Sequence, residues 1–161
     1  MKDTKGKIQG VNGILYEILT KEDTPFRYRL LHDYKVPTPI KLRKTIELEF
    51  VALKTTGTLH IKKGFLWDGA TCFPDFDWII RASLVHDALY KLIFCGLLPP
   101  SLRLVADTML KALLTQDMLK LKAGRIALMA ISGIVYAGVR IFGESRARGS
   151  LQKDQTVYRG E

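Results

Sequence analysis

Apolar and polar residues alternate with a period of two through the middle of the chain. This alternation predicts half-buried β-strands over residues 26–30, 46–53 and 58–61. Residues 8–19 show only a weak helical spacing, which glycines interrupt, and they predict no definite element. We therefore expect a small antiparallel β layer of three or four strands over about residues 26–63.

The second half of the chain changes to a helical period. Apolar positions predict helices at about 77–95, 101–121 and 125–142, and the last is apolar nearly all round, as expected of a buried helix. Strands followed by packed helices indicate an α+β fold. The length fits a single domain over residues 1–143, followed by a polar, flexible tail at 144–161.

Proline, glycine and capping residues mark where these elements should end. The segment V-P-T-P-I at 36–40 should break the β layer, because proline cannot donate to a ladder. Asp75 or Asp77 could cap the first helix, and Gly96 should end it. Ser101, after two prolines, is the expected N-cap of the second helix.

The chain is basic, with a formal net charge of +9 and an isoelectric point near 9.6. Such a charge suits an anionic membrane surface or a nucleic acid. The basic residues are scattered, however, and neither an aromatic-interleaved basic stripe nor a zinc-ligand spacing is present. A nucleic-acid partner is therefore the weaker expectation, and the sequence does not indicate an oligomeric state.

Cysteine usage and hydropathy indicate a protein made in a cytoplasm. Cys72 and Cys95 form no C-x-x-C motif, which fits a reducing compartment. The N-terminus has no apolar run that would form a secretory signal. The longest uncharged run, residues 126–139, is too short to span a bilayer core about 30 Å thick.

A candidate site lies on the first two predicted helices. His86 and Tyr90 are four residues apart and share a helix face, with Asp87 one step around. The short link after Gly96 makes the next helix an antiparallel neighbour and places Asp107 at the height of His86. Asp107 can then fix the imidazole tautomer and leave the other nitrogen as a base, while Tyr90 donates to the same carboxylate.

Asp87 is predicted to point away from this unit, toward the turn W-D-G-A-T at 67–71. There Asp68 adds a second carboxylate, and Gly69 allows a close approach of the backbone. Carboxylates with backbone carbonyls form a hard-oxygen set that suits calcium or magnesium better than zinc. Asp87, Asp68 and Gly69 are thus the candidate metal ligands.

A structural interpretation of the same residues stays open. A His–Asp pair on a buried helix is more often a hydrogen-bonded structural pair than a catalytic one, and Asp68-Gly69 can be an ordinary turn. His32-Asp33 repeats the dipeptide in a strand-to-loop setting, where we interpret it as a surface pair without partners.

Four ordered motifs give the chain a resemblance to a known family. G-F-L-W-D-G-A-T at 64–71, R-A-S-L-V-H-D-A-L-Y at 81–90, A-D at 106–107 and V-R-I-F-G at 139–143 resemble a phage and prophage family catalogued as domain of unknown function 1353. The resemblance covers about residues 26–143. It implies a viral setting and no particular activity.

The helix pair alone is similar to phospholipase A₂, which also carries H-D-x-x-Y and an aspartate on the next antiparallel helix. The resemblance implies that His86 activates a water, that Asp87 binds Ca²⁺, that Asp107 orients the histidine and that Tyr90 supports it. The Gly-rich calcium loop of that family is absent, so W-D-G-A-T would have to replace it.

Two functions follow from these resemblances. The first is a small phage-encoded, metal-assisted ester hydrolase that acts on lipid, with a basic surface that favours anionic membranes. The alternative is a non-enzymatic virion or assembly protein of a tailed phage, which contacts phage structural proteins and uses the His-Asp-Asp-Tyr cluster to stabilise its fold. Either would reside in the host cytoplasm or in the phage particle. The enzyme requires an open cleft at His86, whereas a fully buried imidazole bonded to protein at both nitrogens would contradict it.

Overall fold

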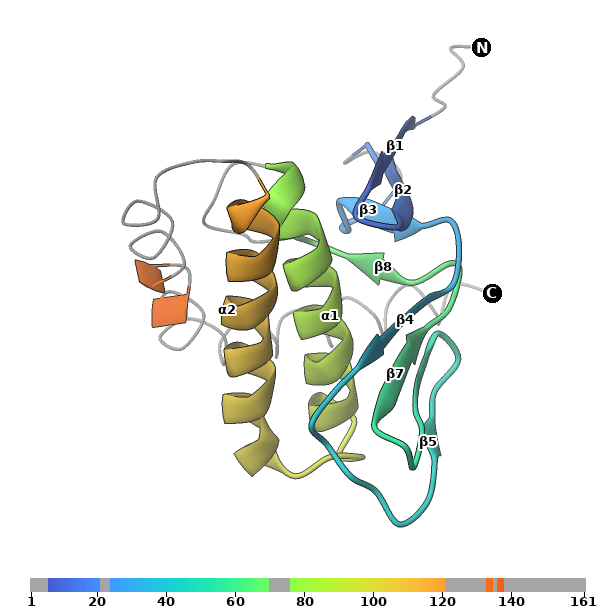
Figure 1. The fold of residues 1–161 in the computed structure, drawn as a ribbon. Helices are drawn as coiled ribbons and strands as arrows, with labels where there is room; N and C mark the ends of the chain where they lie inside the picture. The colour runs from blue at the N-terminus through green and yellow to red at the C-terminus, as the bar shows by residue number, and fades with distance from the viewer. Residues whose placement is uncertain (1–5, 21–23, 70–75, 121–132, 135, 138–161) are drawn as a thin grey trace.

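Two antiparallel sheets stand beside a pair of helices in a computed structural model of the chain (Figure 1). The structure describes residues 6–20, 24–69, 76–120, 133–134 and 136–137. The strands come first in the chain and the helices follow, so the predicted α+β class is confirmed.

Within the described ranges, each sheet has four strands. The first has the order β1-β2-β3-β8, formed by β1 (Lys7–Val11), β2 (Ile14–Ile18), β3 (Tyr28–Leu30) and β8 (Leu66–Trp67). The second has the order β4-β7-β6-β5, formed by β4 (Tyr34–Pro37), β7 (Thr58–Ile61), β6 (Val51–Leu53) and β5 (Ile46–Glu47). The β layer is therefore larger than the predicted layer at about 26–63, because it begins at Lys7 and includes β8.

The added N-terminal strands form a hairpin closed by Asn12 and Gly13. Both residues have positive φ angles, 48° and 79°, which is the backbone of a tight hairpin turn. Asn-Gly is a strong sequence signal for such a turn. The weak helical spacing of residues 8–19 was therefore the wrong guide to this segment.

The predicted strand at 46–53 is also wrong, because it is a hairpin of β5 and β6. The backbone N–H of Leu48 donates to the carbonyl of Val51 at 2.7 Å and closes the turn. Leu48 and Phe50 pack against the core from the turn itself, so the apolar alternation continues through it. The strand predicted at 58–61 is confirmed as β7.

Helix α1 (Asp77–Phe94) and helix α2 (Arg103–Leu119) occupy two of the three predicted ranges. The N-cap of α1 is Phe76, which gives no side-chain cap, and Ser101 lies within a short 3₁₀ turn (Pro100–Leu102) before α2. The predicted capping by Asp77 and by Ser101 is therefore wrong, and Asp75, the other predicted cap of the first helix, lies outside the described residues. Gly96 follows the C-cap of α1 with φ 71°, as expected of a helix-ending glycine.

The third predicted helix, about 125–142, lies almost entirely outside the described residues, and so does the predicted tail at 144–161. Among the described residues, no helix has the length and apolarity needed to cross a bilayer.

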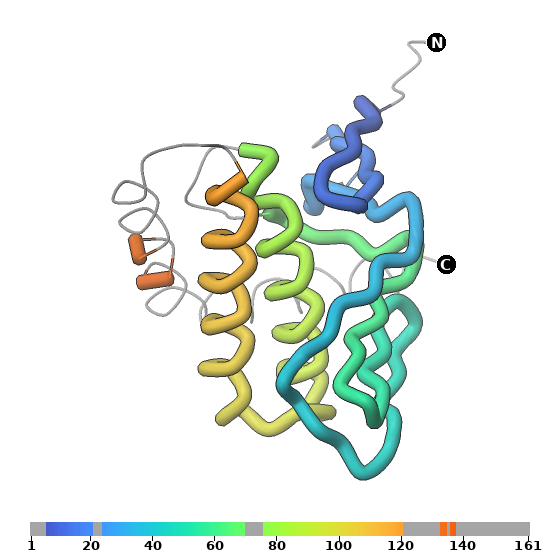
Figure 2. The backbone as a smooth tube through the Cα atoms, in the orientation of Figure 1, coloured from blue at the N-terminus to red at the C-terminus, as the bar shows by residue number. Residues whose placement is uncertain are grey.

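A single hydrophobic core joins both sheets to both helices. Figure 2 shows the short link that makes α1 and α2 antiparallel neighbours, with α1 lying between α2 and the strands. Core residues come from every layer, as Tyr16, Leu30, Leu59, Leu89 and Leu114 illustrate. The buried central position of α1 fixes the side chains that it directs toward α2.

Candidate functional site

His86 lies in the middle of α1 and faces α2. Its Nε2 is 2.9 Å from Oδ1 of Asp107, so the contact predicted across the helix pair is present. The side chain of His86 is 9% exposed and that of Asp107 is fully buried. An ionised carboxylate can only accept hydrogen bonds, so Nε2 must carry the proton that is donated to Asp107.

The same oxygen of Asp107 accepts a second hydrogen bond, from the hydroxyl of Tyr90 at 2.7 Å. The rings of His86 and Tyr90 lie with their centroids 4.1 Å apart. Burial, together with the hydrogen bond to Asp107, raises the pKa of Tyr90 to about 12, so the phenol stays a donor. Arg103, one turn before Asp107, places Cζ 5.8 Å from the Tyr90 ring centroid.

Asp87 lies on the other side of the imidazole. Its Oδ1 is 3.4 Å from Nδ1 of His86, longer than the usual separation of about 2.9 Å, and its side chain is 32% exposed. Burial alone would lower the pKa of His86, but the carboxylates of Asp107 and Asp87 outweigh burial and raise the pKa. Both ring nitrogens therefore have a carboxylate partner, with the longer contact at Nδ1, and the imidazole itself is buried, which counts against the open cleft that the enzyme requires.

The predicted metal ligands Asp68 and Gly69 follow β8. Gly69 has φ 74°, and a Cβ there would meet the Tyr28 ring at 2.7 Å, so this glycine is needed for packing against β3. In the described part of the chain, no group of three or more His, Cys, Asp or Glu side chains could hold a metal ion. Residues 70–71, the end of the W-D-G-A-T motif, lie outside the described residues.

A second His–Asp pair lies on the surface of the second sheet. Nε2 of His60 is 2.7 Å from Oδ2 of Asp33, and the backbone N–H of Lys63 donates to the other oxygen. The Lys63 N–H and then His60 lower the pKa of Asp33. The prediction that His32-Asp33 lacks partners is therefore wrong for Asp33, because the pairing of β4 with β7 places Lys35 opposite His60.

Sequence reasoning missed a buried carboxylate near the other end of the helix pair. Asp117 is fully buried and accepts from Nε of Arg81 at 2.8 Å and from Nζ of Lys120 at 3.0 Å. Lys120 also donates to Asn12 in the β1–β2 turn. Arg81 and Asp117 lie at similar distances before and after the link between the helices. This spacing could have indicated their contact, as it did for His86 and Asp107.

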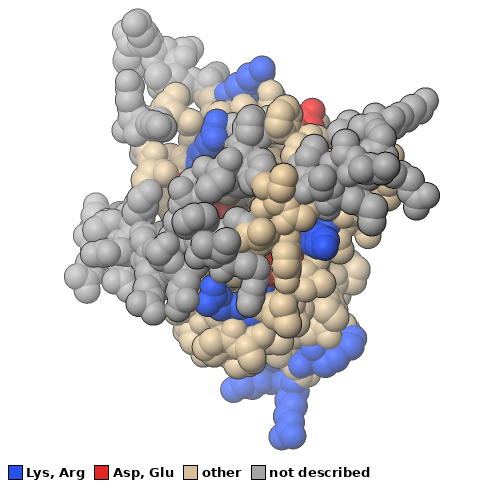
Figure 3. Space-filling model, turned by 90° about the vertical axis from the view of Figure 1, so that its left-hand side faces the viewer, with Lys and Arg blue, Asp and Glu red and all other residues tan. Residues whose placement is uncertain are grey.

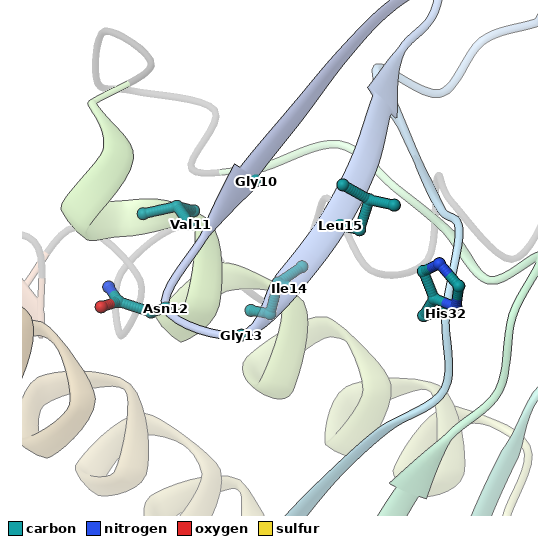
Figure 4. A pocket seen from close by; sticks show the side chains of 7 residues that line it. All are labelled: Gly10, Val11, Asn12, Gly13, Ile14, Leu15 and His32. Atoms are coloured by element: carbon teal, nitrogen blue, oxygen red, sulfur yellow. The ribbon is translucent and has the colours of Figure 1, made fainter.

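A hollow of about 400 Å³ lies beside the β1–β2 turn (Figure 4). It is lined by Gly10, Val11, Asn12, Gly13, Ile14, Leu15 and His32. None of the predicted site residues contributes to it, and its one titratable side chain has no partner suited to catalysis among the lining residues. The cluster around His86 is therefore the stronger candidate site.

No family model, no curated protein and no solved structure matches the chain. The geometry around His86 is thus the main physical evidence about function. It brings together His86, Tyr90 and Asp107 as a unit, with Asp87 at the edge of that unit.

Proposed function

We propose that this chain is a metal-assisted ester hydrolase of the phospholipase type, encoded by a phage or prophage, with His86 as its general base. One observation carries the proposal. The buried carboxylate of Asp107 forms a hydrogen bond with Nε2 of His86, while Nδ1 faces the partly exposed carboxylate of Asp87. This arrangement fixes the tautomer that a base needs and leaves Nδ1, which has the longer contact, to act as the base.

The hydrolytic step follows from these positions. With Nε2–H donated to Asp107, the lone pair of Nδ1 takes a proton from a water, whose oxygen bonds to the ester carbonyl carbon. The bond from that carbon to the alcohol oxygen then breaks, and the imidazolium returns the proton to the leaving alkoxide. Asp107 stabilises the transient imidazolium, and Tyr90 prevents the carboxylate from rotating.

Asp87 is the residue that would hold a calcium ion. Its carboxylate is a hard donor, it is partly exposed, and only a long contact engages it with His86. Following the phospholipase resemblance, Asp68 and the backbone at Gly69 would supply further oxygens. Calcium would stabilise the negative charge that develops on the carbonyl oxygen.

The test is the release of fatty acid from phospholipid vesicles in the presence of calcium. His86→Gln is expected to slow release by at least about 100-fold, because a positioned base contributes roughly that much. His60→Gln is the matched control, since it removes the imidazole of the surface His–Asp pair and should leave the rate unchanged. A wild-type chain that hydrolyses no phospholipid, or a fully active His86→Gln variant, would refute the proposal.

One observation favours a second candidate, a non-enzymatic virion or assembly protein that contacts phage structural proteins. His86 is largely buried, and both of its ring nitrogens lie within hydrogen-bonding distance of a carboxylate. Such a cluster suits a structural role between two helices. This candidate predicts that wild type is inactive and that His86→Gln only loses stability, by about 1–3 kcal/mol.

A further inference from the structure

The segment between β4 and β5 gathers positive charge at one end of the molecule. Lys41, Arg43 and Lys44 are exposed, and residues 38–45 contain no acidic residue. We call these three residues the basic end. They take part in none of the ion pairs formed among the described residues. Figure 3 shows Lys and Arg side chains gathered at the lower end of the molecule, with no Asp or Glu visible among them.

Hydrogen bonds hold this segment against the turn between β6 and β7. The backbone N–H and the hydroxyl of Thr38 both donate to the carbonyl of Gly57 at 2.8 Å. The N–H of Ile40 donates to the Thr38 hydroxyl, and Nζ of Lys41 donates to the carbonyl of Thr56. Ile40 is buried in the core. The basic end is therefore presented on an ordered support.

The acidic residue next along the chain does not neutralise the basic end. Glu47 accepts from Lys62 at 2.6 Å and also lies 4.0 Å from Lys54. Two other cations thus compete for that carboxylate. The basic end keeps its own positive charge for an external partner.

Exposed leucines lie toward the same end of the molecule. Leu97, in the link between α1 and α2, is 40% exposed, and Leu104 at the start of α2 is 53% exposed. The link and the 38–45 segment both lie at the lower end of Figure 1. Asp107 is four residues into α2, roughly 6 Å along the helix axis from this end.

We propose that the basic end is a docking surface for an anionic lipid membrane. Lysine and arginine at the same end as exposed leucines suit such a surface, because the charges contact headgroups while the leucines enter the acyl boundary. A nucleic acid would use the charges and leave the leucines in water. The choice of lipid rests in part on the proposed function, which requires the site to reach an ester in a membrane.

The test compares two triple variants that lose the same charge. Lys41→Gln/Arg43→Gln/Lys44→Gln removes the basic end, and Lys7→Gln/Lys35→Gln/Lys63→Gln removes three exposed lysines elsewhere. Binding is measured by co-sedimentation with vesicles of ether-linked phosphatidylglycerol and phosphatidylcholine. The first triple should bind roughly 100-fold more weakly than wild type, and the control less than about threefold more weakly. Leu97→Ser/Leu104→Ser should also weaken binding, without a change in charge.

The proposed docking surface would be overturned if wild type did not bind these vesicles, or if both triple variants lost the same vesicle affinity. It would also be overturned if the same three residues bound duplex DNA more tightly than the vesicles. The ether lipids have no carboxylic ester to cleave, so their binding is measured separately from hydrolysis. Wild type that binds the vesicles but releases no fatty acid from ester-linked phospholipid would therefore refute the proposed function alone. Hydrolysis without any dependence on the basic end would refute the docking surface alone.

Discussion

At the scale of single residues, Oδ1 of Asp107 is the atom on which the helix pair depends. It accepts from both His86 and Tyr90 in a fully buried position. A buried carboxylate is stable only where donors compensate its lost hydration. Each donor therefore contributes to stability as well as to the orientation of the imidazole.

Tyr90→Phe removes one of these donors and keeps the ring. We expect it to lower the free energy of unfolding by about 2 kcal/mol, because the lost hydrogen bond goes to a charged, buried acceptor. Tyr16→Phe is the matched control, since the Tyr16 hydroxyl donates to the amide of Gln9 and should contribute only about 1 kcal/mol. Urea unfolding of both variants measures the difference, and equal losses would argue against an ionised Asp107.

The pKa of His86 gives a pH dependence with a defined sign. The carboxylates raise this pKa above 6.5 in the folded chain, so protonation favours the folded state. This contribution is complete below about pH 6.5 and is lost as the pH rises through the folded-state pKa. The stability of wild type relative to His86→Gln should therefore fall from about pH 6 to pH 9. A difference that stays constant or grows would contradict the raised pKa.

At the scale of the elements, Asp117 joins α1, α2 and the β1–β2 turn through Arg81 and Lys120. Asp117→Ala leaves Arg81 without its carboxylate at a mostly buried position, and we expect a loss of about 3 kcal/mol. Lys120→Gln should cost less than about 1 kcal/mol, because the Lys120 side chain is largely exposed. Chemical denaturation measures the free energy of unfolding of both variants. A larger loss in Lys120→Gln than in Asp117→Ala would contradict the prediction.

The turn that supports the basic end depends on Gly57. Its φ is 86°, and an added Cβ would lie 2.8 Å from the carbonyl oxygens of Thr38 and Ile40. Gly13 has a similar φ of 79°, with nothing within 4 Å of an added Cβ. Gly13→Ala should therefore cost about 1 kcal/mol from backbone strain, and Gly57→Ala at least 1 kcal/mol more. Thermal unfolding compares the two variants. Equal losses of stability would show that residues 38–40 move to accommodate the added Cβ without an energetic penalty.

At the scale of the whole molecule, one core joins both sheets and both helices. Trp67 is buried at the end of the first sheet, and the other tryptophan, Trp78, lies in α1. In a Trp78→Phe variant the fluorescence therefore reports on the β layer, whereas far-UV circular dichroism reports mainly on the helices. We expect the two signals to change at the same denaturant concentration. Separate transitions would mean that the sheets and the helix pair unfold independently.

The sequence predicted those parts of the fold in which the hydrophobic pattern arises only from the burial of a regular strand or helix. Residues 58–61 alternate because β7 buries one face against the core, and α1 is apolar on most faces because it is buried. The hairpin at 46–53 escaped prediction because its turn residues also pack on the core. The apolar spacing of residues 8–19 resembles that of a helix, and this spacing masks the hairpin that Asn12-Gly13 closes.

For the site, the helix link was sufficient to predict the contacts of His86 and Tyr90 with Asp107. Such contacts depend only on helix rise and chain reversal. The pair of Asp33 with His60 depends on the register between β4 and β7, which the alternation pattern alone does not determine. Whether the backbone after β8 approaches Asp87 depends on loop geometry, for which the sequence offers no periodic signal.

The protonation of the two ring nitrogens of His86 tests the general-base assignment most directly. Long-range ¹H–¹⁵N NMR of the calcium-supplemented protein, at a pH above the raised pKa of His86, distinguishes the two neutral tautomers. We predict a proton on Nε2, donated to Asp107, and a bare Nδ1 available to a water. A proton that stays on Nδ1 and is donated to Asp87 would contradict the account, because Nδ1 would then have no lone pair to take a proton from water.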